Sequence, residues 1–304
     1  MTFEVVKDNA RIESLTDVLT RPEELPDVES FRLAAYNVHN LFGEKPDVHS
    51  SRPDPPASEE QLDALGEMIR NIEPDVIVFE EVQNEKVLAD LFRTRINRRI
   101  KDRKFRFNTF VCIPARDPRG INVALATRLA VRGSLTFHDR EFGPAKDRAM
   151  RFSRDLLGVE LLATKKYGFL CFVAHLKSKM GGEASAHKRG VEAKEIRSIF
   201  EKPPFGGGKR YIDQDMVLCG DMNEDPGEKP IRILKSSRGK ALIDVLKDEG
   251  PTYPTHTRYK KTRLDYIFAS RSIQVEDAKV HREDEKLARE ASDHFPISAT
   301  IRVK

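Results

Sequence analysis

Short apolar runs dominate the pattern of hydrophobic and polar positions along this chain. Runs of about four to eight apolar residues that end at turn residues are typical of buried strands. By this criterion we expect strands at 31–38, 76–82, 121–127, 156–163, 168–175, 217–219, 264–270, 273–280 and 296–303, and near 105–113 and 131–137. The chain is therefore predicted to be rich in strands that lie inside the protein.

Helical periodicity appears in three segments of the core sequence. Residues 58–61, Ser-Glu-Glu-Gln, have the form of a capping box and predict a helix that ends near Ile72. Residues 84–100 and 185–201 carry the other two helical patterns. Helices and strands alternate in no repeating order, which argues against a regular doubly wound sheet. The order favours two sheets packed face to face with helices outside.

One domain accounts for this pattern. A chain of 304 residues fits a single large domain, and we find neither internal repeats nor a linker. We expect residues 1–30 to form an N-terminal extension, which lacks the apolar segment of a secretory signal. Residues 31–304 are expected to form the domain, with loops at 43–57 and 202–210.

The composition adds few constraints. Hydrophobic residues make up 39% and charged residues 34%, and the net charge of +4 permits a polyanionic partner without requiring one. No apolar run approaches the roughly 18–20 residues that span a bilayer, so we expect no membrane contact. Cys112, Cys171 and Cys219 are scattered and predict reduced, buried thiols in a cytoplasmic protein. No Cys-x-x-Cys zinc pattern occurs.

Polar residues recur where the predicted strands end or begin. They are Asn37, Glu81, His175, Asp221 with Asn223, Asp265, and Asp293 with His294. A buried charged group is costly unless it is paired or bound to a metal, so this many polar strand ends indicate one convergent site. Asp221 and Asn223 are two residues apart, which places both side chains on one side of an extended backbone.

These residue types suit phosphoryl transfer with a hard metal ion. Mg²⁺ prefers oxygen ligands, which Glu81 could supply. A histidine oriented by an aspartate, such as His294 with Asp265, can deprotonate water. Donors such as His175 and Asn223 can stabilise negative charge that develops on phosphate oxygens.

Six short motifs in this order resemble the endonuclease/exonuclease/phosphatase superfamily. Between residues 36 and 297 they read Y-N-V, F-E-E-V, H-L-K-S, G-D-M-N, R-L-D-Y-I and S-D-H-F-P-I. Each motif alone is weak, but six in the right order are specific. The resemblance implies a four-layer α/β/β/α sandwich with two packed mixed β-sheets.

The resemblance also implies a role for each matching residue. It places Asn37, Glu81 and Asp293 at the metal, with Mg²⁺ as the expected ion and Mn²⁺ as a second possibility. The implied catalytic residues are His175, Asp221, Asn223, Asp265 and His294, and the implied phosphate contacts are His175, Asn223 and Arg154. The resemblance leaves open whether Asp221 or His294 takes the proton, and whether one or two metal ions bind.

Three positions depart from the usual family pattern. Tyr36 stands where Trp is common, and the segment that contains Arg154 lacks a proline found in the DNase-like branch. His39 stands where many relatives carry an acid or Asn. Imidazole is a poor ligand for Mg²⁺ but a good one for Mn²⁺. His39 is therefore predicted either to contact the metal or to hydrogen-bond a neighbour or the substrate phosphate.

Two basic segments bear on the substrate. Residues 93–106 hold eight basic residues and one acid, and residues 258–263 lie directly before Asp265. Each could form a nucleic-acid surface or merely a solvated face. His281, like the histidines at 138, 187 and 256, has no motif context and is expected at the surface.

The sequence thus favours a metal-dependent phosphodiester hydrolase, most simply a nuclease that acts on DNA or RNA through an activated water. One alternative is a phosphatase or phosphodiesterase for phosphoinositide or lipid headgroups. Another is a non-catalytic binding module that retains the fold. The choice of nucleic acid, endo- or exonuclease action, the oligomeric state and any protein partner stay open.

Overall fold

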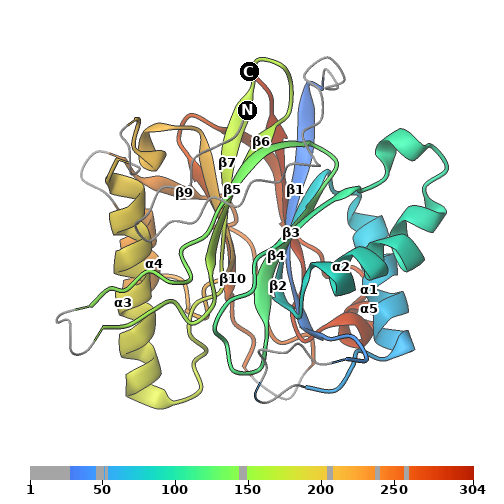
Figure 1. The fold of residues 1–304 in the computed structure, drawn as a ribbon, viewed down its shortest axis with the longest axis horizontal. Coiled ribbons are helices and arrows are strands. Elements are labelled where there is room, and N and C mark those ends of the chain that lie inside the picture. The colour runs from blue at the N-terminus through green and yellow to red at the C-terminus, as the bar shows by residue number, and fades with distance from the viewer. Residues whose placement is uncertain are drawn as a thin grey trace.

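Two six-stranded sheets form the centre of the molecule in the computed structural model (Figure 1). The structure describes residues 28–45, 51, 54–143, 149–203, 208–236, 240–256 and 260–304. The expected N-terminal extension therefore lies outside the described residues, apart from 28–30. The expected loops at 43–57 and 202–210 are described only in part.

The first sheet has the strand order β11-β12-β1-β2-β4-β3. Its strands are β1 (Ser30–Leu41), β2 (Val76–Val82), β3 (Thr109–Cys112), β4 (Asn122–Thr127), β11 (Gln274–Val280) and β12 (Ile297–Arg302). β1 and β2 are parallel, and the other pairs are antiparallel. This sheet brings the first and last strands of the described chain side by side.

The second sheet has the strand order β5-β6-β7-β8-β10-β9. Its strands are β5 (Ala130–Leu135), β6 (Leu156–Leu162), β7 (Gly168–Ala174), β8 (Met216–Asp221), β9 (Leu242–Asp244) and β10 (Asp265–Ser270). Only β7 and β8 are parallel. Both sheets are mixed, as the resemblance implied.

Helices cover the outer face of each sheet and complete four layers (Figure 1). α1 (Glu59–Ile72), α2 (Glu85–Leu91) and α5 (Glu285–Ala291) lie on the first sheet, and α3 (Gly182–Glu201) and α4 (Lys229–Lys235) lie on the second. The sheets pack directly on each other, with the Phe31 ring of β1 stacked on Phe169 of β7 at 5.0 Å. Because these strands are covered on both faces, they appear in the sequence as continuous apolar runs.

Ser58 caps α1, but the Gln61 side chain donates to the Val38 and His39 carbonyls, and no return bond of a capping box is found among the described residues. The Ser58 side chain accepts a hydrogen bond from the Gln61 backbone N–H at 3.1 Å, and Glu59 and Glu60 lie in the first turn. The helix ends at Ile72, where Glu73 adopts a left-handed conformation. The helix that was expected over this segment is confirmed at both ends.

The segment expected as a helix over 84–100 is helical from Glu85 to Arg99, but it changes type after its second turn. Asn84 caps α2, but the chain changes at Phe92–Ile96 to a π-helical turn and then to a 3₁₀ turn. The Asn97 side chain binds the backbone of Phe107 through both its oxygen (3.0 Å) and its nitrogen (2.7 Å). These bonds hold the segment against a neighbouring loop, which a local helical pattern does not reveal.

Three short elements were not predicted. They are α4, α5 and β9, which have seven, seven and three residues. Elements of this length hold too few positions to show a periodicity. The strand expected near 105–113 begins only at Thr109, because Arg103–Phe105 forms a 3₁₀ turn.

Two observations bear on the environment of the protein. No helix in the described part of the chain is long and apolar enough to cross a membrane. Cys112, Cys171 and Cys219 are buried and form no disulfide, as their scattered, apolar settings predicted.

Candidate active site

Two aspartates face each other where β8 ends and β10 begins. The antiparallel register pairs Asp221 directly with Asp265, so the two carboxylates share one face of the second sheet. His294 lies between them, with Nδ1 2.8 Å from Asp265 Oδ2 and Nε2 3.8 Å from Asp221 Oδ2. All three side chains are buried. Their ligand atoms lie within 4.8 Å of one another and form a group that could hold a metal ion.

The turn after β8 brings Asn223 into hydrogen-bond contact with Asp221. Asn223 adopts a positive φ of 50°, and its backbone N–H donates to Asp221 Oδ1 at 2.8 Å. Its side-chain Nδ2 donates to Asp221 Oδ2 at 3.1 Å and to the Leu176 carbonyl at 3.2 Å. The two residues therefore contact each other, as the spacing of the motif predicted.

Gly220 allows this turn to approach the neighbouring strand. Its φ of +128° is unfavourable for any residue with a Cβ atom. A Cβ atom at this position would collide with the carbonyl oxygen of Ala174 and would lie 2.7 Å from Glu80 Oε1. The glycine before Asp221 is thus required by close packing of β8 against β7 and β2.

Asn37 connects the first sheet to this group. Its Nδ2 donates to Asp221 Oδ2 at 3.1 Å, and its Oδ1 accepts a hydrogen bond from the His39 backbone N–H at 3.1 Å. The Ser292 hydroxyl donates to the Asn37 carbonyl at 2.6 Å and accepts from the His294 N–H at 3.1 Å. Residues far apart in the chain therefore fix the imidazole over the two aspartates.

His175 lies at the end of β7 beside the same carboxylate. Its Nε2 is 3.5 Å from Asp221 Oδ2. Burial, and then the nearby cations Arg154, His294 and Arg119, hold the pKa of His175 well below its usual range. His175 is therefore a neutral imidazole at neutral pH.

The protonation states of His294 and Asp221 are set by opposite effects. Burial lowers the pKa of His294, but Asp265 and Asp221 outweigh it and raise that pKa well above its usual range. Burial raises the pKa of Asp221 to about 7, although the charge of His294 opposes this rise. The group holds at least one proton near neutral pH and carries a charged imidazole.

Glu81, the predicted metal ligand, is only partly exposed and faces an arginine. It lies on an irregular part of β2 with a φ of +65°. Its Oε1 is 3.8 Å from Arg119 Nη2, and Arg119 also donates to Asn40 Oδ1 at 3.2 Å. Arg119 comes from the loop between β3 and β4, and nothing in the sequence singled it out.

Glu80, the other acid of F-E-E-V, is fully buried beneath the site. Neither of its carboxyl oxygens has a hydrogen-bond partner in the described part of the chain. Burial, together with the charges of Asp265 and Asp221, raises the pKa of Glu80 well above its usual range. It is therefore a neutral carboxylic acid at neutral pH. The sequence singled out Glu81 and gave no sign that Glu80 is buried, because the irregularity in β2 determines which acid points inward.

Arg154 is buried next to the His175 strand end. Its Nη1 donates to the Leu176 carbonyl at 3.4 Å, and its Nε is 3.2 Å from Asp117 Oδ2. The structure therefore places Arg154 beside the site, and its contact with the substrate phosphate stays a prediction. Asp117 was not predicted, since it lies in a loop without a recognisable motif.

Asp293 and His39 lie to one side of the buried group. Both line a hollow of about 580 Å³ that also includes Tyr253. Among the described residues, no hydrogen bond joins Asn37, Glu81 and Asp293, the three residues expected at the metal. His39 is exposed, and its φ of 49° turns the end of β1 toward this hollow.

The donor set nonetheless fits a hard divalent cation. Asp265 Oδ1 is buried without a hydrogen-bond partner among the described residues. Asp221 offers a carboxylate oxygen within 4.8 Å of a ligand oxygen of Asp265. An oxygen-rich, anionic cluster of this kind is the ligand environment that Mg²⁺ and Mn²⁺ favour.

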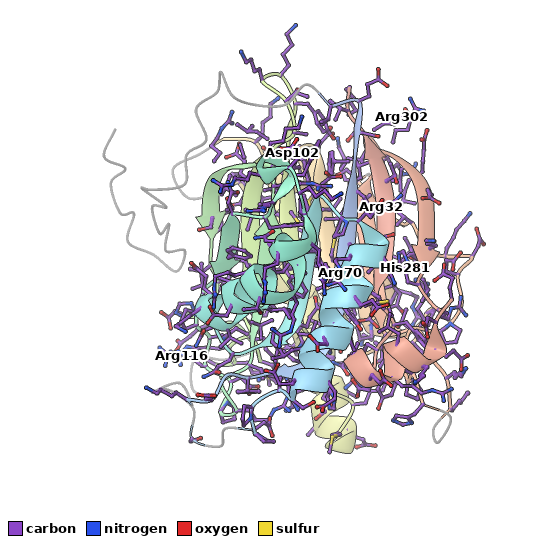
Figure 2. All side chains as sticks on the ribbon, turned by 90° about the vertical axis from the view of Figure 1, so that its right-hand side faces the viewer. Arg32, Arg70, Asp102, Arg116, His281 and Arg302 are labelled. Carbon is purple, nitrogen blue, oxygen red and sulfur yellow. The ribbon has the colours of Figure 1, made fainter. Side chains whose placement is uncertain are left out.

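The two basic segments are not part of the buried site. Arg263 is buried in a two-fold ion pair with Asp244, at 2.9 and 2.7 Å, so it offers no free cation. Lys260 and Lys261 are exposed, and Arg258 lies outside the described residues. In the other segment, Asp102 lies at the opposite end of the sandwich from Arg116 (Figure 2), and Arg95 pairs with Glu59 and Asp63 on α1.

A different set of cations lies beside the site. Arg116, Arg151, Lys177 and Lys188 line a hollow of about 300 Å³ together with Asp117, the ion-pair partner of Arg154. These cations come from four separate places in the chain, so no single charged run in the sequence indicated them.

Comparisons with known proteins agree with this geometry. A sequence profile described as the Endonuclease/Exonuclease/phosphatase family matches residues 34–294. A search of curated proteins found no match. The endonuclease/exonuclease/phosphatase structure from Beutenbergia cavernae is 18% identical, with a TM-score of 0.62 over 91% of this chain and 72% of that chain.

Two further solved structures share the fold. The human nocturnin catalytic domain with a bound sulfate anion is 17% identical, with a TM-score of 0.60 over 91% of this chain and 95% of that chain. ANGEL2, a 2′,3′-cyclic phosphatase in complex with adenosine-2′,3′-vanadate, is 16% identical, with a TM-score of 0.58 over 99% of both chains. At these identities the similarity establishes the fold and not the substrate.

Proposed function

This chain belongs to the endonuclease/exonuclease/phosphatase family, and from that membership we propose that it is a metal-dependent phosphodiester hydrolase of the nuclease type. The observation that carries the proposal is the buried group of His294, Asp265 and Asp221. An imidazole held by one carboxylate at 2.8 Å is oriented for proton transfer through its other nitrogen.

His294 is the proposed general base. Asp265 is hydrogen-bonded to Nδ1 of His294, so Nε2 is the nitrogen that can take a proton from the attacking water. The surrounding carboxylates keep His294 charged, so it can act as a base only when their charge is offset. A bound divalent cation would supply that positive charge and would also polarise the phosphate.

Three donors surround the place that we propose for the scissile phosphate. His175 is neutral and can donate one ring N–H to a phosphate oxygen without adding charge to the site. Arg154 offers a buried guanidinium. The two Nδ2 hydrogens of Asn223 bind Asp221 and the Leu176 carbonyl, so we propose that Asn223 exchanges one of these bonds for the phosphate when substrate binds. Buried donors of this kind stabilise charge that develops on the non-bridging oxygens. For the cation we propose Glu81, Asn37 and the carboxylates beside them, and we propose Asp293 at its edge.

The hollow beside Arg154 favours a polyanionic substrate. Lys177 and Lys188 line it, and neither side chain forms an ion pair with a described residue. Unpaired cations beside a phosphate site can hold the next phosphates of a nucleic-acid strand. A headgroup phosphatase remains the alternative. A non-catalytic role is disfavoured, because a decayed site would be expected to lose its base or its carboxylates first.

The test is a substrate panel assayed with the full chain and Mg²⁺. It should contain supercoiled plasmid, single-stranded DNA, RNA, a 2′,3′-cyclic nucleotide and a set of phosphoinositides. We expect hydrolysis of nucleic acid that EDTA abolishes and that added Mg²⁺ or Mn²⁺ restores. Turnover of phosphoinositides alone would favour the headgroup alternative, and full activity in EDTA would contradict the metal requirement.

A further inference from the structure

A second cleft lies at the end of the sandwich away from the Asp221–His294 group. Its volume is about 560 Å³, and its walls include the start of β1, the start of β2 and the end of β12. Arg32, in this cleft, precedes the site residue Asn37 by five positions on β1, or about 17 Å at the usual rise of a strand. The cleft is therefore separate from the proposed catalytic site.

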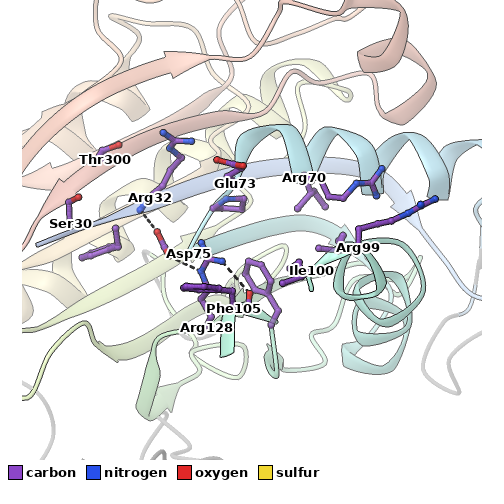
Figure 3. Close-up of a pocket in the computed structure, with 15 residues that line it drawn as sticks. Ser30, Arg32, Arg70, Glu73, Asp75, Arg99, Ile100, Phe105, Arg128 and Thr300 are labelled. Atoms are coloured by element: carbon purple, nitrogen blue, oxygen red, sulfur yellow. Dashed lines mark hydrogen bonds and ion pairs between the residues drawn. The ribbon is translucent and has the colours of Figure 1, made fainter. Parts of the chain in front are cut away.

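Four arginines from different segments line this cleft, against two acids. They are Arg32, Arg70, Arg99 and Arg128, and the acids are Glu73 and Asp75. Four positive and two negative charges leave a net charge of +2. Figure 3 shows Arg70 and Arg99 on one side of the cleft and Arg32, Asp75 and Arg128 on the other.

The arginines differ in the hydrogen bonds that they form with other described residues. Asp75 accepts a hydrogen bond from Arg128 Nε at 2.7 Å and another from the Arg32 backbone N–H at 2.7 Å. Arg70 donates through Nη1 to the Arg95 carbonyl at 2.5 Å, and its other donors have no partner among the described residues. Arg99 is exposed and forms no hydrogen bond or ion pair with any described residue. Arg70 and Arg99 therefore offer uncompensated positive charge to an anion.

An exposed aromatic ring lies in the same cleft. Phe105 is 48% exposed, which is unusual for so large an apolar side chain. Lys104 Nζ lies 4.8 Å and Arg128 Cζ 5.8 Å from the centre of its ring. Ile69, Ile96 and Ile100 supply an apolar wall. A flat ring among cations is the arrangement on which nucleic-acid bases stack.

We propose that this cleft binds a nucleotide unit, with the phosphate on Arg70 and Arg99 and the base on Phe105. A simple anion would use only the arginines, and an apolar ligand would leave them without a partner. A free mononucleotide and the end of a nucleic-acid strand both carry such a phosphate and base. The proposal does not depend on the activity of the catalytic site.

Binding can be measured on the full chain in EDTA, by calorimetric titration with AMP, with inorganic phosphate and with a 5′-phosphorylated oligothymidylate. We expect AMP to bind more tightly than phosphate. Arg99→Gln should weaken AMP binding about tenfold, the usual order for loss of a charged hydrogen bond. Phe105→Leu should bring the affinity for AMP close to that for phosphate.

Arg98 is the matched control, because it is exposed in the same 3₁₀ turn but does not line the cleft. Arg98→Gln should leave AMP affinity unchanged, and so should His294→Ala. Equal weakening by Arg98→Gln, loss of binding in His294→Ala, or equal affinity for AMP and phosphate would overturn the proposal. If the oligonucleotide binds more tightly than AMP and Arg99→Gln weakens it too, the ligand is a strand end. Equal affinity for both would identify a free nucleotide.

Discussion

His294 and Asp265 are expected to act as one unit, because their 2.8 Å contact orients the imidazole. Loss of a positioned general base costs about 10²–10⁴ in rate. We expect His294→Ala and Asp265→Ala each to lose activity near that range in an assay of phosphodiester hydrolysis. The double variant should be little worse than His294→Ala alone. If the two losses multiply, the residues do not share a role.

The adjacent acids Glu80 and Glu81 should respond differently to the same substitution. Glu80 is buried and neutral, so Glu80→Gln replaces one uncharged group with another of similar shape. We expect it to retain most of the activity. Glu81→Gln removes a charge from the proposed cation site and should lower hydrolysis roughly 100-fold. Metal titrations of both variants measure this difference, and the reverse ranking would assign the cation to Glu80.

At the scale of elements, the path of β8 depends on Gly220. A Cβ atom would be strained at its φ of +128° and would collide with Ala174. We expect Gly220→Ala to lower the free energy of unfolding by roughly 2–4 kcal/mol, measured by urea denaturation. Gly133→Ala in β5 is the control, because nothing lies within 4 Å of its added methyl group. Equal stability of the two variants would contradict the packing argument.

His281, which was expected at the surface, is instead buried between β11 and β12. Its ring Nε2 lies 2.8 Å from the Ser298 hydroxyl. Burial, and then the charge of Lys279, lower its pKa from 6.5 to about 4. As the pH falls below 6.5, the unfolded chain takes up the proton first, so stability decreases until about pH 4.

This shift predicts a measurable loss of stability in mild acid. Between pH 7 and pH 5, His281 should account for about 2 kcal/mol of the decrease in unfolding free energy. His281→Gln can still bind Ser298 but does not titrate. Urea denaturation at both pH values should show a smaller decrease for the variant. An identical decrease in both proteins would show that His281 titrates normally.

The sequence predicted most secondary-structure elements and the types of residue in the site. It predicted the local geometry of these residues less well. Apolar runs located most strands, because the strands are covered on both faces. The polar strand ends named His175, Asp221 and His294, which the structure brings together. The pattern could not foresee the irregularity in β2 that turns Glu80 inward. It also did not predict the contact between Arg119 and Glu81, since this contact depends on the path of the loop between β3 and β4.

At the scale of the whole molecule, charge near the site should decide which substrates are used. Lys188, on α3, lines the basic hollow beside Arg154. Lys188→Glu should raise KM on an oligonucleotide roughly fivefold and should reduce the dependence of KM on salt. Cleavage of a small nitrophenyl phosphodiester should be spared, since that substrate has no neighbouring phosphates.

Lys194→Glu is the control for this change, because Lys194 is exposed on the same helix and does not line the hollow. It carries the same change in net charge and should leave KM on the oligonucleotide unaltered. Similar effects of the two variants would mean that the whole molecule attracts the strand and that the hollow has no special part. Equal losses on the large and small substrates would indicate structural damage.

The bonds from Asn37 to Asp221 and from Ser292 to Asn37 join parts of the chain that are 184 and 255 residues apart. β12, the last strand that the structure describes, lies inside the first sheet between β1 and β11. The candidate site therefore assembles only when β12 has paired with β1. A fragment that stops before β12 would keep most of the described strands but could not form the site.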